Sequence, residues 1–290
     1  MSLPTVVVIG PGKIGRDLLI KLLRSPKVNL IGLIGRNYGT SSEKFSTQYN
    51  VPYYGAGLSE YLDHVHDTSI FIDATTAEFH SNHLKLLQPF NPFIVDLTPS
   101  GIGSIYSPLA SPNIPPKGTS ISLVSCGGQT ALPLLYELSS CFTHVEYIEV
   151  VSSMASLAVG PGTRLNIDEY IHTTQSAIKS LLPCPEVKVI LNINPANPPV
   201  TMKTTLSMVG EMKYELDKIK SVAYQTQNLV QAYCPGYSIK VPPVFMNDGR
   251  LVTMLQVSGA GDYLPTYAGN LDIINSSCVE LCEQISSNFF

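Results

Sequence analysis

Near its N-terminus the chain carries an apolar run that leads directly into a glycine loop, Val6-Val7-Val8-Ile9-Gly10-Pro11-Gly12-Lys13-Ile14-Gly15. The apolar run predicts a buried strand, and the leucine-rich segment from Arg16 to Arg24 predicts an amphipathic helix. A Gly-x-Gly-x-x-Gly loop between a strand and a helix is typical of dinucleotide-binding folds. We therefore expect the loop to bind a pyrophosphate at the helix N-terminus. A purely structural glycine turn is the alternative.

The second predicted strand, Leu30 to Ile34, lacks the acidic residue that commonly follows it in such folds and binds the adenosine ribose. Arg36 and Asn37 stand there instead, with Ser41 and Ser42 close behind. Arg36 is a suitable partner for a 2′-phosphate, which favours NADP(H) over NAD(H). The alternative is that Arg36 stacks on the adenine and NAD(H) binds.

Predicted strands and helices continue to alternate in the first half of the chain. We expect helices over residues 41–48 and 77–87, strands over 70–75 and 93–98, and a loop over 104–117. This alternation predicts an α/β fold with a parallel, doubly wound Rossmann sheet. Ligands bind at the carboxyl ends of such strands, which places Thr75 near the cofactor. His80 and His83 have a spacing that metal ligands also use, but without a third ligand we expect a solvated helix face and no metal site.

Cys126 stands between a predicted strand, Ile121 to Val124, and a predicted helix, Ala131 to Leu138. A helix N-terminus favours negative charge, so this position is expected to lower the thiol pKa and to favour the nucleophilic thiolate. Gly127 and Gly128 would let a substrate approach the sulfur. The alternative is a small buried cysteine beside a turn.

The second half predicts an α+β domain with a mixed or antiparallel sheet. Strands are expected over residues 145–154, 187–193, 200–209 and 252–258, and helices over 167–182, 213–232 and 271–285. We expect a Rossmann domain over residues 1–126, a catalytic and dimerisation domain over 127–262, and a C-terminal helix over 263–290 that packs on the first domain. Such second domains often supply a dimer sheet, so a homo-oligomer is expected.

Composition excludes several classes of protein. The 290 residues are 44% hydrophobic and 14% charged, with a net charge of −4, which is typical of a globular protein without a nucleic-acid partner. No apolar stretch is long enough to span a membrane, and no signal peptide is expected. The six cysteines form no CxxC pair, which favours a reduced, cytoplasmic protein over a disulfide framework or a zinc site.

Six motifs in register resemble the acylating acetaldehyde dehydrogenases, the partners of 4-hydroxy-2-oxovalerate aldolase, and the resemblance runs nearly end to end. They are Gly10 to Leu18, Asp96 to Pro99, Ser125 to Gln129, Gly160-Pro161-Gly162-Thr163-Arg164 with Asn166 to Glu169, Asn194 to Pro199, and Tyr263 to Asp272. The resemblance implies oxidation of an aldehyde to an acyl-thioester by NAD or NADP, then transfer of the acyl group to coenzyme A or another carrier thiol, or the reverse reduction. It also implies an aldolase partner.

Site residues follow from the same resemblance. The position of Cys126 matches the family's nucleophile, and we place Gly127, Gln129, Asn166 and Thr204 with it in the catalytic site. The cofactor contacts that the resemblance implies are Gly10, Pro11, Gly12, Lys13, Ile14, Gly15, Gly160, Pro161, Gly162 and Asn270, and the ends of the predicted strands add Arg36, Asn37 and Thr75. Backbone N–H groups at the start of the cysteine helix are expected to hold the oxyanion.

The chain departs from the family pattern at a position that bears on the second half of the reaction. Where the family usually has an acidic residue thought to activate the incoming thiol, this chain has Thr204. A threonine hydroxyl is no general base near neutral pH, so the acyl acceptor is open. Two alternative functions follow. The first is an acyl-phosphate or semialdehyde-type reductase, which would need a histidine such as His144 or His172 as a base beside the thiol. The second is a non-catalytic dinucleotide-binding scaffold.

Overall fold

The computed structural model describes residues 3–160, 164 and 167–290. The chain divides into two compact units. Unit 1 comprises Met1–Tyr106, Asn113–Leu123 and Cys278–Phe290, and unit 2 comprises Ser107–Pro112 and Val124–Ser277. The domain boundaries expected from the sequence stay predictions.

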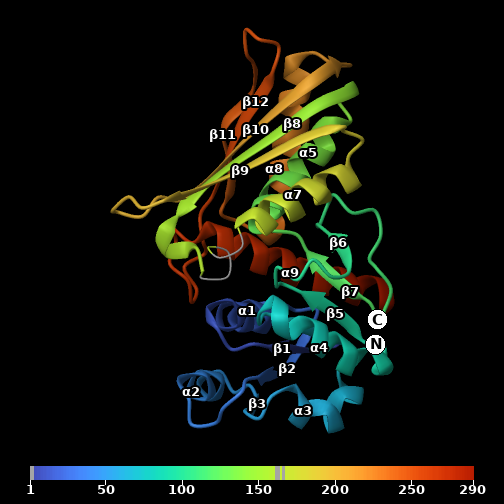
Figure 1. The fold of residues 1–290 in the computed structure, drawn as a ribbon, viewed down its shortest axis with the longest axis vertical. Helices are drawn as coiled ribbons and strands as arrows, with labels where there is room; N and C mark the ends of the chain where they lie inside the picture. The colour runs from blue at the N-terminus through green and yellow to red at the C-terminus, as the bar shows by residue number, and fades with distance from the viewer. Residues whose placement is uncertain (1–2, 161–163, 165–166) are drawn as a thin grey trace. The chain divides into compact units, whose positions relative to one another are not determined.

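Unit 1 is built on a seven-stranded, all-parallel sheet with the order β3-β2-β1-β4-β5-β7-β6 (Figure 1). Its strands are β1 (Thr5–Ile9), β2 (Asn29–Ile34), β3 (Tyr53–Tyr54), β4 (Ile70–Asp73), β5 (Phe93–Asp96), β6 (Ser104–Tyr106) and β7 (Ser120–Leu123). The central strands β4 and β5 are fully buried, as their continuous apolar runs predict. The doubly wound α/β class expected from the sequence is confirmed.

Helices connect the strands of unit 1. They are α1 (Lys13–Arg24), α2 (Ser41–Gln48), α3 (Leu58–Tyr61) and α4 (Ala77–Leu87), with short 3-10 turns η1 (Leu62–Asp67) and η2 (Gln88–Phe90). Helix α1 buries Leu18, Leu19 and Leu22, as its apolar pattern predicts, and it also buries Asp17, which pairs with Lys21. The closing helix α9 (Gly269–Phe289) contributes its residues from Cys278 onward to this unit.

Unit 2 is built on a five-stranded mixed sheet with the order β11-β12-β10-β8-β9, in which only β8 and β9 run parallel. Its strands are β8 (Phe142–Ala155), β9 (Glu186–Asn194), β10 (Met202–Met212), β11 (Tyr237–Phe245) and β12 (Leu251–Val257). Helices α5 (Cys126–Ser139), α7 (Ile167–Leu181) and α8 (Leu216–Tyr233) cover one face of this sheet (Figure 1), and η3 (Ser156–Ala158) follows β8.

Two elements differ from the sequence-based expectation. The segment expected as a loop over residues 104–117 contains strand β6, whose three residues pair with β7. Strand β11 was not expected, because Pro242 and Pro243 remove two ladder donors. The structure accommodates them at the sheet edge, where the register of β11 against β12 shifts between Val241 and Val244.

Across the described residues, the structure holds no helix with both the length and the apolar character that a membrane crossing requires.

Candidate active site

Cys126 is the first residue of helix α5 and follows strand β7 after a two-residue connection. The preceding residue, Ser125, caps the helix, because its hydroxyl accepts a hydrogen bond from the Gly128 N–H at 3.0 Å. Cys126 is half-buried, whereas the other five cysteines are buried. Cys126 is therefore the least buried of the six cysteines.

Helix α7 places Tyr170 beside that sulfur. The Tyr170 Oη lies 3.8 Å from Cys126 Sγ and accepts a hydrogen bond from the Gly127 N–H at 3.0 Å. A Cβ added to Gly127 would lie 2.2 Å from the Tyr170 Oη, so only glycine allows this close approach. Sequence reasoning missed Tyr170. One signal for it existed, since Tyr170 directly follows the Asn166-to-Glu169 motif.

Burial raises the pKa of the Cys126 thiol to about 11, although hydrogen bonds from Tyr170 and from the Gly127 N–H act in the opposite direction. The sequence-based expectation of a lowered thiol pKa is therefore wrong. A helix N-terminus favours the thiolate, but removal of the sulfur from water outweighs that effect here. The pKa of Tyr170 is raised well above its usual value for the same reason.

Two of the expected oxyanion donors at the start of α5 already have partners. The Gly127 N–H donates to Tyr170 and the Gly128 N–H donates to Ser125. These two N–H groups therefore hold Tyr170 and Ser125 in place beside the helix start.

Thr204 and Gln129, two further residues that the sequence assigns to the catalytic site, are both buried. Thr204 is fully buried and hydrogen-bonded to the Ser152 hydroxyl at 3.0 Å, across the paired strands β10 and β8. Ser152 in turn lies 3.1 Å from the position of a Cβ on Gly127. Gln129 is also fully buried, and its Oε1 accepts a hydrogen bond from Ser107 at 3.1 Å. No hydrogen bond that we describe joins either side chain to the Cys126 sulfur.

The glycine loop in unit 1 has the geometry that its sequence predicts. Gly10 has a φ of +103°, and a Cβ there would lie 2.7 Å from the Ala74 carbonyl oxygen. A Cβ on Gly15 would lie 2.0 Å from the Gly10 carbonyl oxygen, so α1 packs directly on the loop. Gly12 caps α1 without a side chain, and a Cβ there would meet nothing within 4 Å. Gly12 and Lys13 are exposed at the helix N-terminus.

Arg36 and Asn37 follow strand β2. The exposed Arg36 guanidinium lies 5.4 Å from the centre of the Phe79 ring. The Asn37 backbone carbonyl accepts a hydrogen bond from Tyr53 at 3.1 Å. Ser41 and Ser42 both accept hydrogen bonds from the Arg16 guanidinium at 2.9 Å, so this cation lies beside their hydroxyls.

Thr75 lies at the carboxyl end of β4 and donates a hydrogen bond to Asp73 at 2.5 Å. Asp73 also bonds His80 at 3.0 Å and His83 at 2.8 Å. His80 is fully buried, and its other nitrogen lies 3.4 Å from Asp96. The expectation of a solvated helix face for the histidines is therefore wrong, because the buried Asp73 bonds both imidazoles and the buried Asp96 lies beside His80.

Opposing effects set the pKa values in this cluster. Burial disfavours ionisation of Asp73, but its bonds to His80 and His83 hold its pKa well below the usual range. Burial alone would lower the pKa of His80, but Asp73 and Asp96 raise it. Burial raises the pKa of Asp96 despite the nearby imidazole.

Asn270 lies in the first turn of α9 and is buried. Its Nδ2 donates to the Ala158 carbonyl at 3.0 Å, and its Oδ1 has no hydrogen-bond partner among the described residues. Gly160 is exposed. Arg164 donates to the Val159 carbonyl at 3.2 Å. Pro161, Gly162 and Asn166, which the sequence also assigns to the site, lie outside the described residues.

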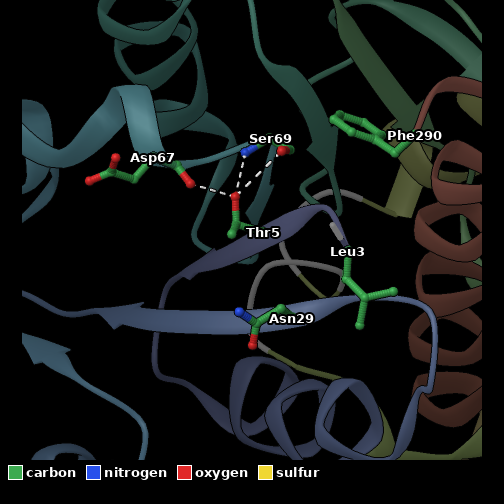
Figure 2. A pocket seen from close by; sticks show the side chains of 6 residues that line it. All are labelled: Leu3, Thr5, Asn29, Asp67, Ser69 and Phe290. Carbon is green, nitrogen blue, oxygen red and sulfur yellow. Dashed lines mark hydrogen bonds between the residues drawn. The ribbon is translucent and has the colours of Figure 1, made fainter. Parts of the chain in front are cut away.

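A pocket in unit 1 is unrelated to these groups. It is lined by Leu3, Thr5, Asn29, Asp67, Ser69 and Phe290 (Figure 2). Thr5 and Asn29 begin strands β1 and β2, so the pocket opens at the amino ends of the parallel strands. Dinucleotides bind at the carboxyl ends, where the glycine loop lies. Among the residues that the structure describes, no three His, Cys, Asp or Glu side chains form a metal-binding group.

A Rossmann-type unit with a glycine loop, followed by a mixed-sheet unit with a cysteine at a helix start, defines the chain as a two-unit α/β protein of the dehydrogenase class. Two solved structures share this fold over 100% of both chains. They are aspartate semialdehyde dehydrogenase II from Vibrio cholerae, with a TM-score of 0.67 and 12% identity, and a probable aspartate-semialdehyde dehydrogenase from Pseudomonas aeruginosa, with a TM-score of 0.69 and 10% identity.

Sequence relatives identify the family. Acetaldehyde dehydrogenase from Pectobacterium atrosepticum is 38% identical, with 97% of this chain and 95% of the relative covered. The enzyme of the same name from Spirochaeta aurantia is 36% identical, with 96% and 93% covered. Residues 126–265 match the family described as prokaryotic acetaldehyde dehydrogenase, dimerisation. The chain belongs to the acylating acetaldehyde dehydrogenase family and is an oxidoreductase of that kind.

Proposed function

We propose that this chain interconverts an aldehyde and an acyl-thioester with a nicotinamide cofactor, through a covalent bond to Cys126. The observation that carries the proposal is the half-buried Cys126 sulfur at the start of α5, held 3.8 Å from the Tyr170 hydroxyl. Family membership supports oxidoreduction between aldehyde and acyl compounds.

The chemistry begins with addition of the Cys126 sulfur to the aldehyde carbon. An S–C bond forms, the carbonyl π bond opens, and the thiol proton is transferred to the oxygen, giving a hemithioacetal. The glycine loop and Asn270 would hold a nicotinamide cofactor, which when bound would supply the hydride acceptor for the same carbon. The carbonyl then reforms as its hydroxyl proton leaves, and the acyl group stays on sulfur as a thioester. A second thiol takes the acyl group and releases the Cys126 thiol, and every step reverses for acyl reduction.

The residues present fit a nicotinamide dinucleotide. The glycine loop and the side-chain-free cap of α1 suit a pyrophosphate. The buried Asn270 Oδ1 is an acceptor without a partner among the described residues, and the nicotinamide carboxamide is a donor that would satisfy it. We assign the loop from Gly10 to Gly15, Thr75, Gly160 and Asn270 to cofactor binding.

NADP(H) is the preferred cofactor in this proposal. Arg36 is exposed after β2, and the Ser41 hydroxyl, which accepts from Arg16, can donate its own hydrogen to a phosphate. Arg36→Ala is therefore expected to lower kcat/KM with NADPH about tenfold and with NADH by less than about twofold. Equal losses with both cofactors would contradict the preference.

Coenzyme A or another carrier thiol is the acyl acceptor. The buried Thr204 bonds to Ser152 and has no basic group to offer, so the incoming thiol must lose its proton elsewhere. A histidine base for an acyl-phosphate or semialdehyde-type reductase finds no support, because no histidine in the described part of the chain bonds to Cys126. The contact between the Cys126 sulfur and the Tyr170 hydroxyl argues against a non-catalytic scaffold.

Steady-state kinetics test the proposal. Purified protein is mixed with NADPH or NADH and a series of acyl-CoA thioesters, and the loss of reduced-nicotinamide absorbance is followed. We expect turnover with at least one short acyl-CoA and none with Cys126→Ser. The proposal fails if the wild-type protein turns over no thioester or aldehyde, or if Cys126→Ser keeps its activity.

Assembly and location complete the proposal. The match to a dimerisation family supports a homo-oligomer built on unit 2. An aldolase partner rests on the family resemblance, and copurification with a 4-hydroxy-2-oxovalerate aldolase would test it. A cytoplasmic location stays a prediction from the unpaired cysteines.

A further inference from the structure

The proposed addition step needs a group that handles a proton beside the sulfur. The Cys126 pKa of about 11 means that the thiol carries its proton near neutral pH, and the raised pKa of Tyr170 means that the phenol does so too. The thiol must therefore lose its proton as the S–C bond forms, while the carbonyl oxygen must gain one.

Tyr170 has the hydrogen-bond geometry for both transfers. Its Oη accepts from the Gly127 N–H at 3.0 Å, so its own hydrogen is available to a second acceptor. The Cys126 sulfur is 3.8 Å away. A carbonyl oxygen on the carbon that bonds this sulfur would lie close to the same hydroxyl. The bond from the Gly127 N–H also strengthens the phenol as a donor, because hydrogen bonds in a chain polarise one another.

The surrounding structure fixes the phenol in place. Tyr170 is 7% exposed, and its backbone carbonyl accepts from the Thr174 hydroxyl at 2.7 Å. Because Thr174 donates there, Ser125 donates to Thr174 in their 2.5 Å contact. Ser125 also caps α5. These bonds connect helix α7 to Ser125, the residue that precedes Cys126. They therefore keep the Tyr170 hydroxyl next to the Cys126 sulfur.

Other hydroxyls near the sulfur are less suited to this role. Thr204 and Ser152 bond to each other, and Ser152 approaches the Gly127 backbone rather than the sulfur. Ser125 is committed to the helix cap and to Thr174. Tyr170 is the described residue whose hydroxyl contacts Cys126 Sγ.

We propose that Tyr170 is a catalytic residue that relays the proton during addition of Cys126 to the aldehyde. As the S–C bond forms and the carbonyl π bond opens, the S–H proton passes to Tyr170 Oη and the phenol hydrogen passes to the carbonyl oxygen. Tyr170 ends unchanged, and no external acid, base or oxidant is needed. The relay rests on the proposed function and adds a proton donor for the carbonyl oxygen.

Tyr170→Phe tests the relay, with Tyr237→Phe as the matched control. Tyr237 is also fully buried in unit 2 and donates to the Thr130 carbonyl of α5 at 3.3 Å, but its hydroxyl is not bonded to the sulfur. We expect kcat to fall about a hundredfold in Tyr170→Phe, with KM for the aldehyde changed less than about threefold. In Tyr237→Phe we expect kcat within about twofold of wild type.

A second measurement keeps the proposal testable if Tyr170→Phe does not fold. Site-specific replacement of Tyr170 by 3,5-difluorotyrosine keeps the ring and hydroxyl but lowers the phenol pKa. We expect an alkaline loss of kcat that begins at lower pH than in wild type, because an ionised phenolate has no hydrogen to donate. A purely structural tyrosine would leave the pH profile unchanged.

The outcomes separate the relay from the function on which it rests. If wild type is active, Cys126→Ser is inactive and Tyr170→Phe keeps kcat within about twofold of wild type, the relay is wrong and the function stands. An unshifted pH profile in the fluorinated protein likewise rejects the relay. If wild type turns over no aldehyde or thioester, the proposed function itself fails.

Discussion

Cys126 combines two opposing influences on a single sulfur. Its place at a helix N-terminus and its bond to Tyr170 favour the thiolate, while burial favours the neutral thiol and prevails. A neutral resting thiol protects the enzyme from unspecific oxidation and alkylation, because the thiolate is the reactive form. Activation then belongs to the bound substrate and the adjacent phenol.

The raised thiol pKa makes a direct prediction about alkylation. Because Cys126 is half-buried and the other cysteines are buried, iodoacetamide should label Cys126 first in the folded protein. The rate should rise with pH throughout the range from 7 to 10 without a plateau, since the thiol titrates near 11. Peptide mapping against Cys126→Ser assigns the site. A plateau near pH 7 would show a lowered pKa instead.

At the residue scale, the sequence could single out Cys126 and the glycine loop because they form short local motifs. It did not predict the direction of the thiol pKa, since burial depends on chain segments distant in sequence. It also missed Tyr170, because one tyrosine on an amphipathic helix has the pattern of an ordinary core residue. The assignment of Thr204 to the catalytic site stays a prediction, and its hydroxyl is bonded to Ser152.

The glycine loop shows how one element divides its work between packing and ligand binding. A Cβ on Gly15 would collide with the Gly10 carbonyl, whereas a Cβ on Gly12 would meet nothing in the protein. Gly15 therefore serves the helix-to-strand packing, and Gly12 leaves an open position that suits the proposed pyrophosphate.

Two substitutions separate these roles. Gly15→Ala should lower the free energy of unfolding by about 3 kcal/mol, because the loop must move to admit the methyl group. Gly12→Ala should change it by less than about 0.5 kcal/mol, since the site is open and φ is −72°. Gly12→Ala should instead weaken cofactor binding about tenfold. Urea unfolding and cofactor titration measure the two effects, and equal destabilisation by both variants would contradict this division.

The cluster of Asp73, His80 and Asp96 fixes the loops after β4 and β5, next to the glycine loop. The pKa of His80 is raised by these carboxylates, so the charged imidazole stabilises the fold. This contribution is fully present below the pKa of a free histidine and is lost as the pH rises through the folded pKa. The depressed pKa of Asp73 has the opposite dependence, and its contribution is lost in acid.

Removal of His80 should therefore cost stability in a pH-dependent way. His80→Asn is expected to lower the free energy of unfolding by about 3 kcal/mol at pH 6, because Asp73 loses a buried partner. The loss should be smaller at pH 9, where wild-type His80 carries less charge. Denaturant titrations at both pH values measure it, with the exposed His144→Asn as control. A loss that grows with pH would reverse the sign and reject this account.

At the element scale, most helices and strands were predicted because their hydrophobic periods are long and regular. Strand β11 was not, since Pro242 and Pro243 are incompatible with a central strand and only an edge position tolerates them. Strand β6 has three residues, too few to show a period.

On the scale of the whole chain, the face of the unit 2 sheet that α5, α7 and α8 leave uncovered is the surface that we propose for assembly. Helices α5, α7 and α8 cover one face (Figure 1). On the other face, one row runs across all five strands through half-buried residues, which are Val241, Met254, Thr205, Val151 and Ile190. An apolar row of this kind on a sheet is suited to pairing with a second copy.

Introduction of a charge into this row should dissociate the oligomer. Met254→Glu is expected to reduce the mass in solution to that of one chain, because burial of an unpaired carboxylate at the interface is costly. Lys218→Glu, an exposed change on helix α8, should leave the mass unchanged. Sedimentation equilibrium measures both. A wild-type protein with the mass of a monomer would contradict the expected assembly.

The central claim is that Cys126 carries the acyl group, and intact-protein mass spectrometry tests it most directly. The protein is incubated with a reactive acyl-CoA without reduced cofactor, and its mass is measured before and after NADPH is added. We predict one acyl group per chain on Cys126, which disappears on reduction as free aldehyde is released. An enzyme that turns over acyl-CoA but never carries an acyl group on Cys126 would contradict the account.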